Sequence, residues 1–251
     1  MIGIVGFGRF GALAARYLSR DFPVWVYDKG QKGKRIEAAG ARGASLEAVC
    51  QQRLLLLCVP ISAMQQQLRT VAPLLGAKTI VADVCSVKTL PVQWMKSLLP
   101  STAQLLPTHP MFGPDSAAET LAGGKIVLCR ERIEARRFDR IRVWLEAQGL
   151  EVIETTPADH DRQIAVSLSL THFIGRSLSA FGAKKQVIDT EGYKRLMHIL
   201  GVVENDSWQL FVDMHCYNPY AREQRLAFIN AMQAINLDLE ACEFEHRHDK
   251  D

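Results

Sequence analysis

Met1-Ile-Gly-Ile-Val5 and, directly after it, Gly6-Phe-Gly-Arg-Phe-Gly11 decide the fold of this chain. The first stretch predicts a buried strand, and apolar residues at helical spacing from position 10 to 18 predict a helix that packs on a sheet. In a Gly-x-Gly-x-x-Gly turn between a strand and a helix, the glycines allow a tight turn, close approach of a pyrophosphate and close helix packing. Asp28 follows Gly6 by 22 residues, at the end of the next predicted strand. This context predicts a dinucleotide-binding domain.

Short apolar runs alternate with helix-like stretches as far as about residue 153, the pattern of parallel βαβ units. Further strands are predicted at 23–27, 54–59, 79–83, 104–108, 125–129 and 150–153, and a helix at 136–148.

Beyond Pro157 no strand pattern returns. The stretch 160–181 has almost no helix breakers and is apolar nearly all round, which predicts a helix buried among other helices. Helical stretches follow at 193–203 and 206–233, the latter broken near Pro219. The predicted fold class is therefore α/β, with a Rossmann-type domain at 1–154 and an all-α domain at 155–251.

The composition is that of a globular protein, with 48% hydrophobic and 23% charged residues. A net charge of +3 is too balanced for a nucleic-acid-binding surface. The strongest apolar run, 54–61, is far shorter than the about 20 residues that cross a membrane. The N-terminus enters a predicted strand directly, without the basic leader typical of a signal peptide. The 6 cysteines stand singly, which favours buried thiols over a metal site. We expect a cytoplasmic protein without metal, membrane or nucleic-acid partners.

Three segments carry side chains suited to chemistry: Asp83-Val-Cys-Ser86-Val-Lys88, Thr108-His109-Pro-Met-Phe-Gly-Pro114 and Thr171-His172. The first two follow predicted strands, at whose carboxyl ends open α/β sheets bind ligands. His109, in a loop expected to face a cleft, fits a general base with a pKa near 6.5. His172, on an apolar helix, fits a core histidine as well as a ligand contact.

Asp28 favours NAD over NADP, because a carboxylate there accepts hydrogen bonds from the ribose 2′-hydroxyl and repels a 2′-phosphate. Lys29, Lys32, Lys34 and Arg35 follow at once and could hold a phosphate. Since a run of charges is more often a solvated face, the sequence favours NAD and leaves NADP open.

These motifs resemble the prephenate/arogenate dehydrogenase family of tyrosine biosynthesis. The three segments above occur in the family's order, together with the glycine-rich turn, His160-Asp161 and Gly175-Arg176. The run 205–211, with 217–219 and Glu223-Gln224 after it, is most similar to the plant-type arogenate dehydrogenases.

The resemblance implies an oxidative decarboxylation, in which hydride leaves the hydroxyl-bearing ring carbon for the nicotinamide, carbon dioxide departs and the ring becomes aromatic. His109 would take the hydroxyl proton, and Ser86 would hold His109 and the hydroxyl in register. The cofactor-binding residues assigned in this way are Gly6, Phe7, Gly8, Arg9, Phe10, Gly11, Asp28, Cys58, Val59, Pro60 and Asp83. The substrate-binding residues are Ser86, Lys88, His109, Thr171, His172 and Asp206.

Two departures limit the resemblance. Several bacterial relatives carry an arginine for the side-chain carboxylate where this chain has Val202. Four alternatives stay open for that contact: Arg176, Arg195, Arg222 and Lys88. Asp206 stands where arogenate-specific relatives carry an acidic residue, which would attract an ammonium group, and it fits equally a helix N-cap.

The helical domains of two subunits interlock in this family, and all-round apolar helices would leave much apolar surface exposed in one chain. We therefore expect a homodimer. Two other functions remain open. A hydroxyacid dehydrogenase or imine reductase generally relies on a lysine or aspartate of the helical domain. A non-catalytic cofactor sensor would lack the polar set of Ser86, His109 and His172.

Overall fold

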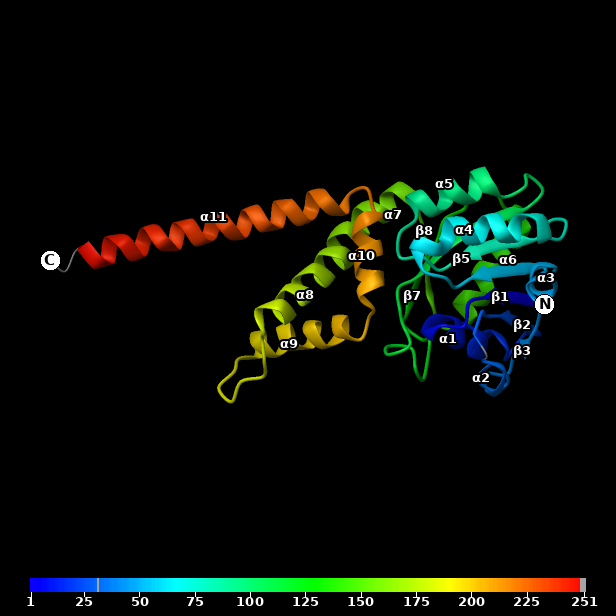
Figure 1. Cartoon of the computed structure of the whole chain (residues 1–251), viewed down its shortest axis with the longest axis horizontal. Coiled ribbons are helices and arrows are strands. Elements are labelled where there is room, and N and C mark those ends of the chain that lie inside the picture. The colour runs from blue at the N-terminus through cyan, green and yellow to red at the C-terminus, as the bar shows by residue number, and fades with distance from the viewer. Residues whose placement is uncertain (31, 249–251) are drawn as a thin grey trace. The chain divides into compact units, whose positions relative to one another are not determined.

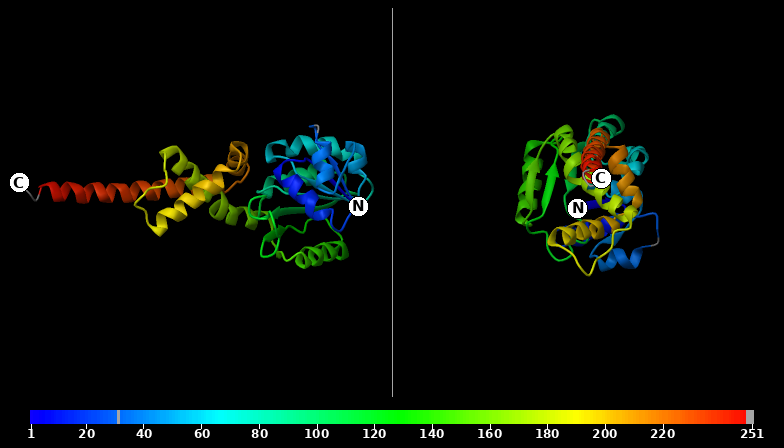
Figure 2. Two further views of the ribbon diagram at one scale, coloured as in Figure 1. Left: turned by 90° about the horizontal axis from the view of Figure 1, so that it is seen from below. Right: turned by 90° about the vertical axis from the view of Figure 1, so that its left-hand side faces the viewer.

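A computed structural model describes residues 1–30 and 32–248, with side chains given through residue 243. The chain divides into two compact units, Met1–Asp161 and Arg162–Asp251 (Figures 1 and 2). The first unit is built on a β-sheet, and the described part of the second is helical, which confirms the predicted fold class. The first unit extends past the predicted boundary at residue 154, because His160 and Asp161 bond to residues of the sheet unit.

Eight strands form one sheet in the first unit, in the order β3-β2-β1-β4-β5-β6-β7-β8. They are β1 (Ile2–Val5), β2 (Val24–Tyr27), β3 (Arg42–Gly43), β4 (Leu54–Leu57), β5 (Ile80–Asp83), β6 (Gln104–Pro110), β7 (Lys125–Leu128) and β8 (Glu151–Glu154). All neighbours are parallel except β6 and β7, where the predicted parallel arrangement is wrong. The segment 111–124 between them has no helix to carry a crossover, so the chain returns antiparallel.

Helices cover the faces of this sheet (Figure 1). They are α1 (Arg9–Leu18), α2 (Gly33–Ala38), α3 (Leu46–Cys50), α4 (Ile61–Val71), the 3₁₀ turn Ala72–Leu74, α5 (Thr89–Leu98) and α6 (Ala135–Ala147). Every residue of β1 and of β5 is buried, as expected for parallel strands covered on both sides.

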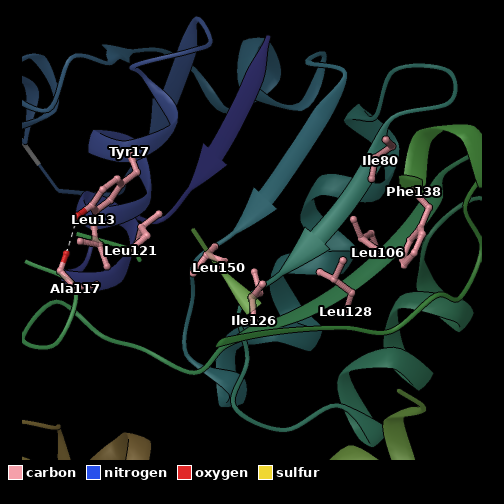
Figure 3. Close-up of a cluster of buried hydrophobic side chains, with 10 residues drawn as sticks. All are labelled: Leu13, Tyr17, Ile80, Leu106, Ala117, Leu121, Ile126, Leu128, Phe138 and Leu150. Atoms are coloured by element: carbon pink, nitrogen blue, oxygen red, sulfur yellow. Dashed lines mark hydrogen bonds between the residues drawn. The ribbon is translucent and has the colours of Figure 1, made fainter. Parts of the chain in front are cut away.

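A buried apolar cluster joins α1 to the half of the sheet that carries β6 and β7 (Figure 3). Leu13 and Tyr17 of α1 belong to the same cluster as Leu106 of β6 and Leu128 of β7. The Tyr17 hydroxyl donates a hydrogen bond of 3.0 Å to the Ala117 carbonyl, which lies between β6 and β7. This contact ties the segment that follows β6 to the helix of the glycine-rich turn.

The chain passes into the second unit within α7 (Pro157–Ile164). The second unit continues with the π-helical segment Ala165–Leu170, α8 (Thr171–Phe181), α9 (Glu191–Glu204), α10 (Trp208–Cys216) and α11 (Ala221–His248). The break between α10 and α11 confirms the one predicted near Pro219, and α11 continues well past residue 233. Cys216 and Cys242 are exposed, so the expectation of buried thiols is wrong for these two.

The first three of these segments form one continuous helix, Pro157–Phe181. Among the described residues this helix alone is long and apolar enough, by length and composition only, to cross a membrane. It is not buried among other helices as predicted: Val166 is 49% and Phe181 84% exposed. The described helices of one chain are too few to cover a helix that is apolar nearly all round.

Candidate active site

The glycine-rich turn lies at the carboxyl end of β1, where the strand order reverses. β2 lies on one side of β1 and β4 on the other, which is the switch point at which open α/β sheets bind ligands. Gly6 has a φ of +96°, and a Cβ there would lie 2.3 Å from the carbonyl oxygen of Cys58. Only glycine fits this turn, which brings the predicted cofactor segments 6–11 and 58–60 together.

The other two glycines of the motif differ in their surroundings. A Cβ at Gly11 would lie 2.1 Å from the Gly6 carbonyl oxygen, so α1 packs closely on the turn. A Cβ at Gly8 would meet no atom within 4 Å, so the backbone there faces open space. Among the described residues no side chain caps the start of α1 at Arg9, which leaves backbone N–H groups for an anion. These features fit the pyrophosphate of a nicotinamide dinucleotide.

Asp28 is engaged by the protein itself. Its Oδ2 accepts a hydrogen bond of 2.6 Å from the Phe7 N–H, and its Oδ1 accepts one of 2.8 Å from the Gly30 N–H. Lys32 Nζ lies 3.0 Å from the same Oδ1. Burial raises the pKa of Asp28, but the hydrogen bonds from Gly30, Phe7 and Lys32 outweigh it and lower that pKa. Asp28 is therefore ionised, as predicted, and paired with a cation.

Asp83 and Lys88 form a fully buried ion pair at the ends of β5 and β6. The Lys88 ammonium donates to Asp83 and, at 2.5 Å, to the Thr108 carbonyl. Asp83 also accepts from the N–H groups of Cys85 and Thr108. The structure gives both residues a buried ion pair, and the cofactor role predicted for Asp83 and the substrate role predicted for Lys88 stay predictions. Because buried charges are costly without partners, these contacts hold the two strand ends in place.

His109 lies within β6, opposite Val127 of β7, and not in the predicted loop. The antiparallel pairing with β7 continues the strand through Pro110, so the imidazole is only 5% exposed. Its Nδ1 lies 2.9 Å from Nε2 of His160, and His160 Nδ1 lies 2.8 Å from Oδ1 of Asp161. A chain of hydrogen bonds therefore runs from the histidine of β6 to a buried carboxylate.

Asp161 fixes the direction of these hydrogen bonds. Burial raises the pKa of Asp161, but hydrogen bonds from His160 and from the N–H groups of Thr89 and Lys88 lower it below the ordinary value. An ionised carboxylate only accepts, so His160 donates from Nδ1 and accepts at Nε2. His109 must then donate from Nδ1, which leaves its Nε2 as the free lone pair.

Burial, the neighbouring His160 and the Lys88 charge hold the pKa of His109 well below its ordinary value. The value near 6.5 predicted for an exposed loop histidine is therefore wrong, and the ring is neutral at neutral pH. From the sequence, His160 and Asp161 are named only as part of the family resemblance, and no catalytic or binding role is predicted for them. Two ionisable residues at the start of an apolar helix were the signal that could have identified them.

Ser86 follows β5, whose neighbour in the sheet is β6. The residue is buried, and among the described residues its Oγ has no hydrogen-bond partner. Since buried hydroxyl groups are nearly always bonded, this oxygen fits a contact with a bound ligand. No hydrogen bond between Ser86 and His109 occurs within the described part of the chain, so their predicted register stays a prediction.

In the helical unit, His172 of α8 faces Asp206 from the α9–α10 connection. His172 Nε2 lies 3.7 Å from Asp206 Oδ2, and His172 Nδ1 is buried without a partner among the described residues. Burial and Arg176 lower the pKa of His172, against the opposite effect of Asp206. The N-cap of α10 is Ser207, which accepts from the Leu210 N–H, so the alternative of an Asp206 cap is wrong.

Thr171 precedes His172, and its hydroxyl donates a hydrogen bond of 3.0 Å to the Ser167 carbonyl one turn earlier. The structure therefore gives Thr171 an intrahelical bond, and its predicted contact with substrate stays a prediction.

The four cations proposed for a carboxylate contact occupy different environments. Lys88 is buried with Asp83, Arg222 is exposed, and the exposed Arg195 pairs with Glu191. Arg176 is half-buried: it donates 2.5 Å to the Asp206 carbonyl, and its guanidinium lies 5.8 Å from the Trp208 ring centroid. Among these four, Arg176 alone adjoins His172 and Asp206.

Comparison with known proteins gives two family models and several relatives. Residues 18–154 match the model described as prephenate dehydrogenase, nucleotide-binding domain, and residues 177–250 match that of a TYRAAT1-like C-terminal domain. The chain is 31% identical to Arogenate dehydrogenase 2, chloroplastic, of Arabidopsis thaliana over 95% of this chain and 69% of that protein. It spans only 39% of the length of Arogenate dehydrogenase 1 from the same plant.

Solved structures share the fold. Arogenate dehydrogenase of Synechocystis matches 96% of this chain and 92% of its own, with a TM-score of 0.72 and 24% identity. Prephenate dehydrogenase of A. aeolicus, in complex with hydroxyphenyl propionate and NAD+, matches 98% and 91%, with a TM-score of 0.75 and 19% identity. With a family model that covers residues 18–154 and a plant relative matched over most of both chains, this chain belongs to the prephenate/arogenate dehydrogenase family of oxidoreductases.

Proposed function

We propose that the chain catalyses the oxidative decarboxylation of arogenate, prephenate or both, with transfer of hydride to a nicotinamide dinucleotide, in tyrosine biosynthesis. The observation that carries this proposal is the hydrogen-bonded chain of His109, His160 and Asp161, which leaves His109 Nε2 as a neutral base. Family membership supports the reaction class, and the buried chain supplies the base that this class needs.

When bound, the oxidised nicotinamide ring accepts the hydride. His109 Nε2 accepts the proton of the ring hydroxyl as hydride leaves the same carbon. Asp161, through His160, stabilises the imidazolium that forms. Loss of carbon dioxide leaves its electron pair in the ring, which becomes aromatic, and His109 can return the proton to the phenolate oxygen. A base positioned in this way contributes typically about 10²–10⁴-fold.

The backbone of the glycine-rich turn and the start of α1 would hold the pyrophosphate, with segment 58–60 beside it. Asp28 would accept hydrogen bonds from the adenosine ribose, and we propose that NAD is favoured over NADP on this ground. Ser86, with its unpartnered Oγ, would bond to the substrate hydroxyl.

The helical unit would supply the residues that recognise the substrate side chain, among them Thr171 and His172. Asp206 favours the ammonium of arogenate over the keto group of prephenate, because a carboxylate pairs with a cation. Arg176 takes the side-chain carboxylate in place of the arginine that Val202 replaces, since its Nε is buried without a partner among the described residues.

We also propose a homodimer in the cytoplasm. Ile235 and Leu239, one turn apart on α11, are 61% and 58% exposed in the single chain. The apolar helix Pro157–Phe181 carries charged side chains such as Arg162 and Arg176, which are costly in lipid, so a second copy is its better cover. Sedimentation should find a dimer, and Ile235→Glu with Leu239→Glu should yield monomers. A wild-type monomer at micromolar concentration overturns this assignment.

One assay tests the proposed reaction. The protein is mixed with arogenate or prephenate and with NAD or NADP, and the absorbance of the reduced nicotinamide is followed. We expect turnover in at least one of the four mixtures, with release of carbon dioxide in equal amount. Absence of reduction in all four, with the protein folded and dinucleotide bound, contradicts the proposed function.

A further inference from the structure

Asp28, the acid expected to exclude a 2′-phosphate, shares its charge with a neighbouring lysine. We propose that Lys32 sets how strongly this chain discriminates NAD from NADP, by neutralising Asp28 and by offering its ammonium to the 2′-phosphate. This inference rests on the proposed function only in requiring that a nicotinamide dinucleotide binds at the glycine-rich turn. It assigns the balance between the two cofactors to a pair of residues and not to the carboxylate alone.

Part of the Lys32 ammonium has no partner among the described residues. Its Nζ lies 3.0 Å from Asp28 Oδ1 and donates to the Phe7 carbonyl at 3.1 Å. An ammonium has three N–H donors, so one remains for a ligand. The Lys32 side chain is 29% exposed, against 13% for Asp28. The cation is therefore the more accessible partner of the pair.

The charges around this pair are mainly positive. Lys29, Lys34 and Arg35 are exposed close by in the chain. Arg35 also lines a cavity of about 380 Å³ next to Phe7, together with Arg9 and Arg16.

These two arginines are held by the segment between β6 and β7, whereas Lys32 contacts the discriminating carboxylate itself. Arg9 pairs with Asp115 at 2.5 Å, and Arg16 donates to the Ala118 carbonyl at 2.5 Å. Lys32 is therefore the cation that both touches the discriminating carboxylate and keeps a donor available.

Removing the Lys32 charge should act on the two cofactors in opposite directions. Without the lysine, Asp28 keeps its hydrogen bonds from Phe7 and Gly30 but loses its paired cation, and a 2′-phosphate would meet an uncompensated negative charge. NAD carries a hydroxyl at that position, which can donate to the Asp28 carboxylate and is not repelled by its charge. For a partly exposed group in salt, we expect about a tenfold loss of affinity for NADP, with the affinity for NAD unchanged or improved.

The test measures dissociation constants of NADPH and NADH for the full chain, by fluorescence of the reduced nicotinamide. The variants are Lys32→Met, which removes the charge at similar length, and Lys32→Arg, which restores it. Lys29→Met is the matched control, an exposed lysine of the same basic run. We expect Lys32→Met to raise the NADPH constant about tenfold and leave the NADH constant unchanged or lower, with Lys32→Arg and Lys29→Met close to wild type.

Salt gives a second readout, because screening weakens a phosphate–ammonium contact. The NADPH constant of the wild type should rise with salt more steeply than the NADH constant, and Lys32→Met should remove most of that difference. Equal weakening of both cofactors by Lys32→Met would mean that the lysine only supports the Phe7 turn, and would overturn the proposal. So would unchanged constants. Failure of both dinucleotides to bind the wild type would overturn the proposed function as well.

Discussion

The two units of this chain differ in how fully their buried polar groups are hydrogen-bonded and in how much apolar surface they expose. In the nucleotide-binding unit, Asp83, Lys88, His109 and Asp161 are buried and partnered. In the helical unit, large apolar side chains are exposed, and four buried polar atoms lack partners within the described residues, against two, on Trp25 and Ser86, in the nucleotide-binding unit. The exposed ones include Phe181, Val187, Ile188, Trp208, Ile235 and Leu237, and the unpartnered atoms are on Ser169, His172, Arg176 and His215.

This difference is what the proposed dimer would explain, because a single chain leaves more apolar surface exposed in the helical unit than in the nucleotide-binding unit. A group buried with its partners holds a shape and a protonation state before any ligand arrives, as His109 requires. Exposed apolar helices and unpartnered polar atoms are costly unless another molecule covers them. The contrast agrees with a preformed base in one unit and with a helical unit completed by a second copy and by substrate.

The buried ion pair gives the largest expected change in stability. Lys88→Met removes one partner of a fully buried pair and leaves the Asp83 charge uncompensated, which should lower the free energy of unfolding by about 3–5 kcal/mol. Lys125→Met is the matched control, because its pair with Glu151 is exposed and worth at most about 1 kcal/mol. Urea denaturation followed by circular dichroism measures both. Equal midpoints for the two variants would contradict the role given to Lys88.

His109→Asn tests the preformed base. The amide keeps polarity and approximate size but takes no proton at neutral pH, so kcat should fall by two orders of magnitude or more. The dissociation constant of the dinucleotide should stay at the wild-type value, because His109 lies within β6 and not in the glycine-rich turn. Steady-state kinetics and cofactor titration measure the two quantities. An unchanged kcat would remove His109 from the mechanism.

Asp161→Asn tests the remote end of the hydrogen-bonded chain. The amide carries no charge and both donates and accepts, so it no longer fixes the tautomers of His160 and His109. We expect kcat to fall about tenfold or more with KM little changed. The control is Asp159→Asn, an exposed carboxylate two residues earlier that bonds to Thr156. A rise in KM at constant kcat would give Asp161 a binding role instead.

Asp206→Asn probes the helical unit with the smallest expected effect. Without the carboxylate, the ratio of kcat/KM for arogenate to that for prephenate should fall by about tenfold, since only arogenate carries an ammonium. Ser207→Ala removes the N-cap of α10 and should lower stability by about 1 kcal/mol while leaving that ratio unchanged. The account of Asp206 fails if the ratio is the same before and after the substitution.

The sequence predicted the fold and the position of the glycine-rich turn, because both depend on local pattern. The structure around glycines such as Gly6 and apolar strands such as 54–57 can be predicted from the residues next to them in the sequence. Contacts between distant positions carry no such local signal. Sequence reasoning therefore placed His109 in an exposed loop and left Lys88 open to substrate, whereas β7 and Asp83 bury them.

Asp206 shows a further limit of pattern. A polar pair before Trp208 predicts a helix start correctly, but either residue satisfies the same capping pattern. The structure assigns the cap to Ser207, and the nearness of Asp206 to His172 depends on how α8 packs against the α9–α10 connection. That packing includes Gly175, where a Cβ would lie 2.5 Å from Val203.

The most direct test of the central claim is the pH dependence of kcat/KM, which reports the free enzyme's base. Burial, His160 and Lys88 lower the pKa of His109, and a base acts only when deprotonated, so activity should persist as the pH falls below 6.5. We predict an acid limb with an apparent pKa below 6.5 that is absent from the residual activity of His109→Asn. An acid limb at or above 6.5, or one that the variant retains, would contradict a neutral His109 held by His160 and Asp161.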